Sequence, residues 1–468
     1  MPGAKVIKLE ENYRSTSHIL NAANSVIRNN FGRRGKELWS NKGEGEKVFI
    51  KQFDNQNEEA KFIVNKMMEL VIREKRKYSD FAVLYRTNAQ SNSIENVLMK
   101  SGIPYRVVGG RRFYERKEIK DILAYLCVVN NPSDNLRLER IINEPKRKIG
   151  EATMTAVRAI AESEPIEGGM FRVMEHAEEY PSVSKAQGKF APFVALIRSL
   201  QKTAETEKLS GVVRAVIEQS GYMAMLLAAE ENGESAERRE NVEEFISNAV
   251  EYETQNENAT LGSFLEEIAL VTDIDNYDSG AEAAVLMTIH SAKGLEFPVV
   301  FLPGMEEGIF PSQMSAFSAD ELEEERRLAY VALTRAEQRV YALCARERLL
   351  YGRTQYNPKS RFLDEIDEAY KTEELAAPKP KFRTEFGEKS QKYVFSNEFT
   401  AKSALTGNVG KTKSGETFLV GDRVSHYMFG AGTVLSVREM GADILYEIAF
   451  DTVGTKKLMA TYAKLKKL

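Results

Sequence analysis

Cysteine is nearly absent from this chain of 468 residues, which contains only Cys127 and Cys344. Two cysteines are too few for a disulfide framework or a tetrahedral metal site, so a reducing, cytoplasmic environment is expected. No run of about 18 apolar residues is present, which argues against a membrane span. The N-terminus, Met1 to Lys5, also lacks the apolar core of a signal peptide.

A strong charge of one sign is missing as well. The formal net charge is −4, which leaves the partner open because phosphate contacts depend on where individual Lys and Arg side chains lie. Hydrophobic residues make up 43% and charged residues 29%, a profile typical of globular proteins. At 52.8 kDa the chain is too large for one core, and two to four domains are expected.

Two separate parts of the chain, residues 1–112 and 276–369, alternate short apolar runs with amphipathic helical patterns. Such strand–helix alternation predicts an α/β fold with a parallel sheet. Residues 113–275, between them, carry helical patterns almost throughout. The sequence therefore predicts one sheet domain that is interrupted by an all-α insertion.

The C-terminal part has a different composition. Residues 370–415 contain Pro378-Lys379-Pro380-Lys381 followed by Ser, Thr, Gly and Lys without periodicity, which is typical of a flexible linker. Residues 416–468 contain three short strand-like runs separated by glycines and predict a small β-barrel. Its aromatic residues Tyr427, Phe429 and Tyr446 could fill the barrel core or contact a partner.

The first string that suggests chemistry is Leu9-Glu10-Glu11-Asn12-Tyr13-Arg14-Ser15-Thr16. At a junction between a loop and a helix, the Tyr13 ring can stack on a base while the Arg14 guanidinium reaches a phosphate. Ser15 or Thr16 would cap the amphipathic helix that begins at His18. The alternative is an ordinary capped helix with a surface Tyr-Arg pair.

The second string runs from Leu286 to Pro298 and reads LMTIHSAKGLEFP. A buried strand would deliver small polar groups and His290 to its carboxyl end, where open α/β sheets bind ligands. Gly294 permits a tight turn, and Glu296 could accept hydrogen bonds from ribose hydroxyls. For a single histidine taken alone, a structural role is the more common alternative.

The third string, from Glu323 to Ala336, reads EEERRLAYVALTRA. Its acidic and basic residues could form i,i+4 pairs on a solvated helix face. Arg335 differs from them because it lies at the predicted helix end, just before the next strand. In that place a guanidinium could stabilise charge on a phosphoryl group during transfer.

Taken together and in this order, the three strings resemble motifs IV, V and VI of UvrD/PcrA-type superfamily 1 DNA helicases. A fourth string, Tyr85-Arg86-Thr87-Asn88-Ala89-Gln90-Ser91, is similar to an intermediate motif of that family. The similarity runs from about Ala4 to Glu365, and the tail resembles the PcrA-type Tudor-like barrel. The resemblance implies a RecA-like sheet domain, called 2A, a helical insertion, called 2B, and the C-terminal half of an ATP-dependent 3′–5′ helicase.

The resemblance also implies roles for individual residues. Tyr13 would stack on adenine, Arg14 would contact the γ-phosphate, Glu296 would bind the ribose, and Arg335 would act as an arginine finger. Single-stranded DNA would be contacted by four further residues: Arg86, Asn88, Thr288 and His290.

One stretch departs from the family pattern. Glu144-Pro145-Lys146-Arg147-Lys148-Ile149-Gly150 corresponds to a segment in which the family often has Gly-Ile-Gly against duplex phosphates. Lys148 replaces the first glycine. Its positive charge favours phosphate binding, but its side chain puts the close backbone approach in doubt.

A phosphate-binding loop requires Gly-x4-Gly-Lys-Ser/Thr. Gly410-Lys411-Thr412 is the nearest match, but Leu405 stands where the first glycine should be. Leu363-Asp364-Glu365 resembles a Mg²⁺-binding acidic pair but has a helical pattern. The family places both elements in its first RecA-like domain. We therefore expect ATP and Mg²⁺ as cofactors with the Mg²⁺ ligands in that domain, an artificial or unusual start at Met1, and no ATP hydrolysis by this chain alone.

Two hypotheses for function remain open. In the first, the chain supplies the arginine finger and half of the DNA track to a helicase whose other half lies elsewhere, and it acts at junctions of single- and double-stranded DNA in the nucleoid. In the second, the insertion and the barrel form a non-catalytic module that recruits DNA or a protein such as RNA polymerase.

Overall fold

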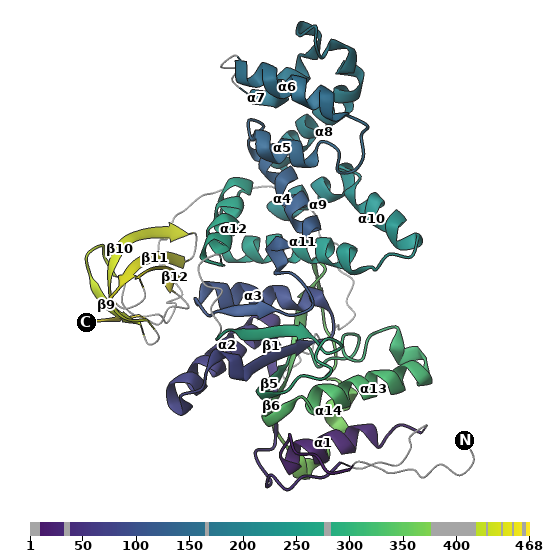
Figure 1. Cartoon of the computed structure of the whole chain (residues 1–468), viewed down its shortest axis with the longest axis vertical. Coiled ribbons are helices and arrows are strands. Elements are labelled where there is room, and N and C mark those ends of the chain that lie inside the picture. Colours follow the sequence, from purple (N-terminus) through teal and green to yellow (C-terminus); the bar gives the residue numbers. More distant parts are fainter. Residues whose placement is uncertain are drawn as a thin grey trace, which may run out of the picture.

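The computed structural model describes residues 10–31, 38–163, 168–275, 282–375, 418–426, 429–440, 443–451, 454–460 and 465–468. They form a parallel sheet domain, a helical domain that extends from it, and a small antiparallel β domain (Figure 1). The sheet order is β3-β4-β2-β5-β6-β1-β8, and β7 pairs with β6. Its strands are β1 (Val48–Asn55), β2 (Phe81–Tyr85), β3 (Tyr105–Val107), β4 (Ala284–Thr288), β5 (Phe297–Leu302), β6 (Ala336–Leu350), β7 (Arg353–Gln355) and β8 (Lys371–Glu374).

Strands from both sides of the insertion build this one sheet. Strand β2 pairs in parallel with β4 and β5, and β6 pairs in parallel with β5 and β1. The prediction of a single α/β domain interrupted by an insertion is therefore confirmed. One boundary differs from expectation. Strand β8 adds an edge strand beside β1 within the linker that was expected to begin at residue 370.

Helices cover both faces of the sheet. On one face α1 (Ser17–Ile27) and α13 (Ala319–Leu333) share a core with strand residues such as Ala82 and Val300. On the other face α2 (Gln56–Glu74) and α3 (Ser91–Lys100) pack on strand residues such as Val83 and Phe301. Alternate residues of each central strand thus enter opposite cores, as the two-residue period of a strand requires.

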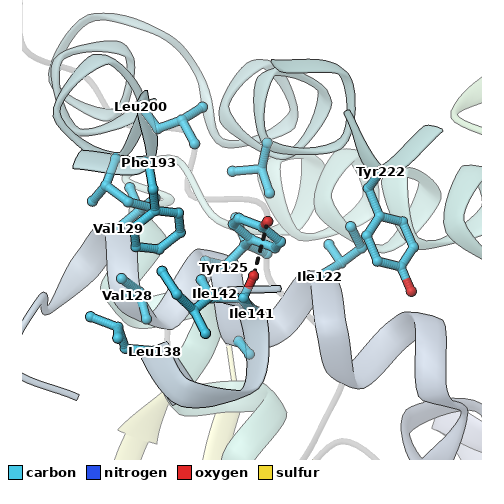
Figure 2. Packing of buried hydrophobic residues seen from close by; sticks show 14 of the residues in the cluster. Ile122, Tyr125, Val128, Val129, Leu138, Ile141, Ile142, Phe193, Leu200 and Tyr222 are labelled. Carbon is cyan, nitrogen blue, oxygen red and sulfur yellow. Dashed lines mark hydrogen bonds between the residues drawn. The ribbon is translucent and has the colours of Figure 1, made fainter. Parts of the chain in front are cut away.

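The insertion is helical, as predicted, and has its own core. In Figure 2 the ring of Tyr125 lies among apolar side chains of α4, α5 and α8. Its hydroxyl donates to the carbonyl of Glu144 at 2.6 Å and also lies 3.4 Å from the carbonyl of Ile141. The helices are α4 (Lys117–Asn130), α5 (Asn135–Ile141), α6 (Glu151–Ser163), α7 (Gly169–Glu175), α8 (Gln187–Thr206), α9 (Leu209–Gln219), α10 (Tyr222–Glu231), α11 (Glu237–Gln255) and α12 (Leu261–Asp275).

None of the described helices is by itself long and apolar enough to cross a membrane. Helices α9 and α10 pass that test only as a pair bent by 54°.

The C-terminal β domain is a five-stranded antiparallel sheet in the order β12-β11-β10-β9-β13. Phe429 and Tyr446 are buried in its core, which confirms the core interpretation for these two rings, whereas Tyr427 lies outside the described residues. The strands are β9 (Arg423–His426), β10 (Gly430–Met440), β11 (Asp443–Phe450), β12 (Gly454–Met459) and β13 (Lys466–Lys467).

Of the two look-alike motifs, one lies within the described residues. Leu363 and Asp364 belong to the short helix α14 (Arg361–Asp364), with Leu363 buried, so this acidic pair does not end a buried strand. The Gly410-Lys411-Thr412 string lies outside the described residues.

Candidate functional sites at the two edges of the sheet

The motif from Leu286 to Pro298 reaches both edges of the sheet. Because β4 and β5 both run parallel to β2, the end of β4 and the start of β5 lie at opposite ends of the parallel strands. We term the side where the parallel strands end the carboxyl edge and the side where they begin the amino edge. Thr288 is therefore at the carboxyl edge, and Glu296, one residue before β5, is at the amino edge. The segment between them crosses the face covered by α1 and α13, where Ile289 and Ala292 are buried. The expectation that the strand delivers small polar groups and His290 to its carboxyl end agrees with the positions of Thr288 and His290, whereas Glu296 lies at the opposite edge.

At the amino edge the structure brings together the residues expected to bind a nucleotide. The Phe297 amide donates to the carbonyl of Arg335 at 2.9 Å, which places Glu296 beside the start of β6. The Nε atom of Arg14 donates to Oε2 of Glu296 at 2.6 Å, and its Nη1 donates to the carbonyl of Thr334 at 3.3 Å. Two arginines and one carboxylate from three distant segments thus meet in one place.

The segment that carries Tyr13 and Arg14 is anchored to β6. The side-chain oxygen of Asn12 accepts hydrogen bonds from the Arg14 amide at 2.8 Å and the Ser15 amide at 2.9 Å, which forms a local turn typical of asparagine. The Ser15 hydroxyl donates to the carbonyl of Ala336 at 2.6 Å. Ser15 therefore fixes the loop to the strand instead of capping the helix.

Thr16 is the residue that occupies the N-cap position of α1, which begins at Ser17, but its side chain makes no cap hydrogen bond. The predicted cap position is therefore right and the predicted cap interaction is wrong. Tyr13 is 74% exposed, and its hydroxyl donates to Glu11 at 2.6 Å. One face of an aromatic ring is thus available for stacking.

The charges at the amino edge favour an anion. Arg14 lowers the pKa of the Glu296 carboxyl through its hydrogen bond and its charge. Burial lowers the pKa of Arg335, and the positive charge of Arg14 lowers it further. Among the described residues, the Arg335 guanidinium donates to uncharged groups at 3.1 to 3.4 Å: the carbonyls of Val331 and Leu295 and the hydroxyl of Thr334. Its positive charge is therefore held in place without being neutralised by these partners.

At the carboxyl edge lie the residues expected to contact DNA. Arg86 follows β2, and its guanidinium bonds to Glu325 of α13. Asn88, in the next turn, donates to Glu237 of α11 at 2.6 Å. His290 is exposed, and burial of part of its ring together with the charge of Arg86 lowers its pKa. Thr288 shares a 3.0 Å hydrogen bond with a neighbouring serine hydroxyl.

Lys148 lies in the loop between α5 and α6 of the insertion, and Figure 1 shows these two helices away from the sheet domain. Its φ of 58° is in the left-handed region, which costs a residue with a side chain about 1–2 kcal/mol and favours glycine. The side chain is exposed. The backbone at Lys148 therefore has the conformation that a glycine would adopt, with an exposed side chain that ends in an ammonium group.

Sequence reasoning missed Asn12 and Glu325, which hold Arg14 and Arg86. Asn12 had a local signal, an asparagine shortly before the residues whose amides it binds. Glu325 is 239 positions from Arg86, and no sequence pattern joins the two.

With this geometry established, comparisons with known proteins decide the family. A family model described as the UvrD-like helicase C-terminal domain matches residues 7–347. The chain belongs to this family. A second model, the PcrA/UvrD tudor domain, matches residues 420–467, in agreement with the β domain.

Similar proteins named "ATP-dependent DNA helicase PcrA" extend over the whole chain. The protein of Bacillus subtilis (strain 168) is 42% identical over 480 residues, which cover 100% of this chain and 63% of that protein. The protein of Leuconostoc citreum is 40% identical over 480 residues with the same coverage. That of Staphylococcus epidermidis (strain ATCC 12228) is 42% identical over 471 residues, 100% of this chain and 62% of its own length. The chain thus spans slightly less than two thirds of the length of these relatives.

Proposed function

We propose that this chain is the C-terminal portion of an ATP-dependent DNA helicase that moves 3′ to 5′ along single-stranded DNA and unwinds duplexes. The observation that carries the proposal is the cluster of Arg14, Glu296 and Arg335 at the amino edge. A segment of the same motif continues from this cluster to the carboxyl edge. The relatives named as ATP-dependent DNA helicases support the same activity.

The amino-edge residues suit the three parts of ATP. The exposed Tyr13 ring would stack on adenine, Glu296 would accept from the ribose, and Arg335 would approach the γ-phosphate. Arg14 now donates to Glu296, so we propose that it transfers this hydrogen bond to the γ-phosphate when Glu296 takes the ribose. ATP supplies the phosphoryl group and, with it, the charge that the two guanidiniums stabilise. We expect the Mg²⁺ ligands to belong to the first RecA-like domain of the helicase.

The carboxyl edge would contact single-stranded DNA through Arg86, Asn88, Thr288 and His290. Asn88 now bonds to Glu237 of the insertion, so DNA binding there would compete with a contact between the sheet and the helical domain. Lys148 would bind a duplex phosphate on the outer part of the insertion. The site of action would be the cytoplasm, at junctions of single- and double-stranded DNA in the nucleoid.

The β domain suggests a second role as a docking module. Leu419, Val420 and Leu435 are 72%, 64% and 48% exposed, and apolar side chains on the surface of so small a domain favour a protein partner. RNA polymerase is the candidate partner.

Complementation tests the proposal. The chain is mixed with, or fused to, the N-terminal part of a PcrA relative that carries the phosphate-binding loop. We expect no ATP hydrolysis by the chain alone, DNA-stimulated hydrolysis by the complemented protein, and unwinding of duplexes with 3′ but not 5′ single-stranded tails. Hydrolysis that DNA does not stimulate would contradict the helicase proposal, and retention of partner binding without any hydrolysis would favour the docking module.

A further inference from the structure

The acidic residue Glu325 is almost completely buried at the carboxyl edge, next to the proposed DNA track. Its side chain is 4% exposed, and its Oε1 accepts from Arg86 Nε at 3.0 Å and Nη2 at 2.8 Å. Its other oxygen accepts from the Ser312 amide at 3.3 Å. A buried carboxylate bound to two nitrogens of a guanidinium is a strong and directional contact.

This contact determines which part of Arg86 is available. Nε and Nη2 point at Glu325, and within the part of the chain that the structure describes Nη1 makes no hydrogen bond. The Arg86 side chain is 23% exposed. Because a guanidinium is planar and rigid, fixing two of its nitrogens also fixes the direction of the third.

Helix α13 joins this contact to the opposite edge of the sheet. It begins after the loop that follows the carboxyl end of β5 and ends at Leu333, just before Arg335 and the start of β6. Its 15 residues span about 22 Å at 1.5 Å per residue. Figure 1 shows α13 lying along the sheet domain. Glu325 and the proposed arginine finger are thus attached to one rigid element.

We propose that Glu325 is a positioning residue that aims Nη1 of Arg86 at a phosphate of single-stranded DNA and connects this contact to the helix that carries Arg335. The inference rests on the proposed function. Glu325 itself does not touch DNA, since its negative charge is buried and bound to Arg86. A movement of α13 would therefore displace Arg86 relative to the strand.

The proposal differs from a simple electrostatic role in the sign of its effect. Removing a negative charge near a DNA track should tighten DNA binding if charge alone matters. Removing the carboxylate that orients Arg86 should instead weaken binding, even though the protein becomes more positive. Glu324 provides a matched control because it is the preceding residue of the same helix, is 63% exposed and pairs with Arg327.

The experiment uses the whole chain and a fluorescently labelled oligothymidine, with affinity measured by anisotropy over a range of KCl concentrations. The variants are Glu325→Gln, Glu324→Gln, Arg86→Gln and the double variant Arg86→Gln/Glu325→Gln. For a single strand, each phosphate contact contributes about 0.7 to the slope of log K against log salt. We expect Glu325→Gln and Arg86→Gln each to make this negative slope less steep by about 0.7 and to reduce the affinity by about tenfold.

The double variant should bind no more weakly than either single variant, because both remove the same contact. Glu324→Gln should leave the slope unchanged, and Glu325→Asp, which keeps the carboxylate, should recover part of the affinity. Melting temperatures identify any variant that is merely unfolded, since that defect would not be limited to one phosphate contact.

Two results would overturn the inference for different reasons. If the wild-type chain binds with a salt-dependent affinity and Glu325→Gln binds as tightly as Glu324→Gln, Glu325 does not position Arg86 and the proposed function stands. If the wild-type chain shows no salt-dependent binding, the proposed DNA contact fails, and the inference fails with it.

Discussion

Replacing Glu244 with glutamine should change the pH dependence of stability. Glu244 is on α11 where the insertion meets the turn between β6 and β7, and it is 5% exposed. It accepts from the Tyr351 amide at 3.0 Å and from the Ser247 hydroxyl at 3.2 Å. Burial raises its pKa from the ordinary 4.5 to about 8, so the folded protein keeps this carboxyl protonated near neutral pH.

The sign and size of the pH effect on stability follow from the linkage between proton binding and folding. A group whose pKa is raised by folding stabilises the protein fully below its unfolded pKa, and this contribution is lost as the pH rises towards the folded pKa. One pKa unit corresponds to about 1.4 kcal/mol. From about pH 6 to about pH 8.5 the wild-type chain should therefore lose about 2–3 kcal/mol through this residue alone. Glutamine has a similar shape and does not ionise.

Urea denaturation followed by helical circular dichroism, at both pH values, measures the effect. The unfolding free energy of Glu244→Gln minus that of the wild type should rise by about 2–3 kcal/mol between the two, and the subtraction cancels all other titrating groups. Glu243→Gln is the control, because this half-exposed neighbour pairs with Arg239 at 2.9 Å and should change stability by less than about 1 kcal/mol. If the unfolding free energy of Glu244→Gln minus that of the wild type does not vary with pH, folding does not raise the pKa of Glu244.

Three further predictions concern stability in other parts of the chain. Arg348→Met should lower the free energy of unfolding in urea by about 3–5 kcal/mol, because Arg348 is the buried partner of Glu59 at 2.8 Å and Glu306 at 2.6 Å. Arg73 is exposed, so Arg73→Met should lower it by less than about 1 kcal/mol. Equal losses for the two variants would contradict this ranking. Burial lowers the pKa of His426 to about 4, so the β domain should have its full stability above about pH 6.5 and lose it as the pH falls towards 4. Protection of its amides from hydrogen exchange measures this loss. Protection that stays constant over this range would show that the protonation of His426 is not linked to folding. Lys148→Gly should raise the free energy of unfolding by up to about 1 kcal/mol, and with it the melting temperature, because glycine adopts a positive φ without strain. Lys146→Gly should not raise the melting temperature.

Sequence patterns predicted the central elements of the sheet domain, because buried strands such as β2 and amphipathic helices such as α13 follow short periods. They also placed Arg335 between a helix and a strand, as observed. They did not predict the edge strand β8. They could not place Glu296 at the edge opposite Thr288, since that depends on strand direction in the sheet. Nor could they pair Arg86 with Glu325 or Arg14 with Glu296, because these contacts join residues separated by 239 and 282 positions. Motifs therefore identified the chemical groups, and the fold determined which of them meet.

The turnover number for ATP hydrolysis tests whether Arg335 is the arginine finger of the proposed helicase. In the complemented protein with saturating DNA and ATP, Arg335→Ala should lower kcat by about 10³-fold or more while DNA affinity and melting temperature stay close to wild type. Its neighbour Arg339→Ala, which removes an ion pair with Glu74, should keep kcat within a few-fold. If the Arg335→Ala protein hydrolyses ATP at the wild-type rate, Arg335 is not the arginine finger.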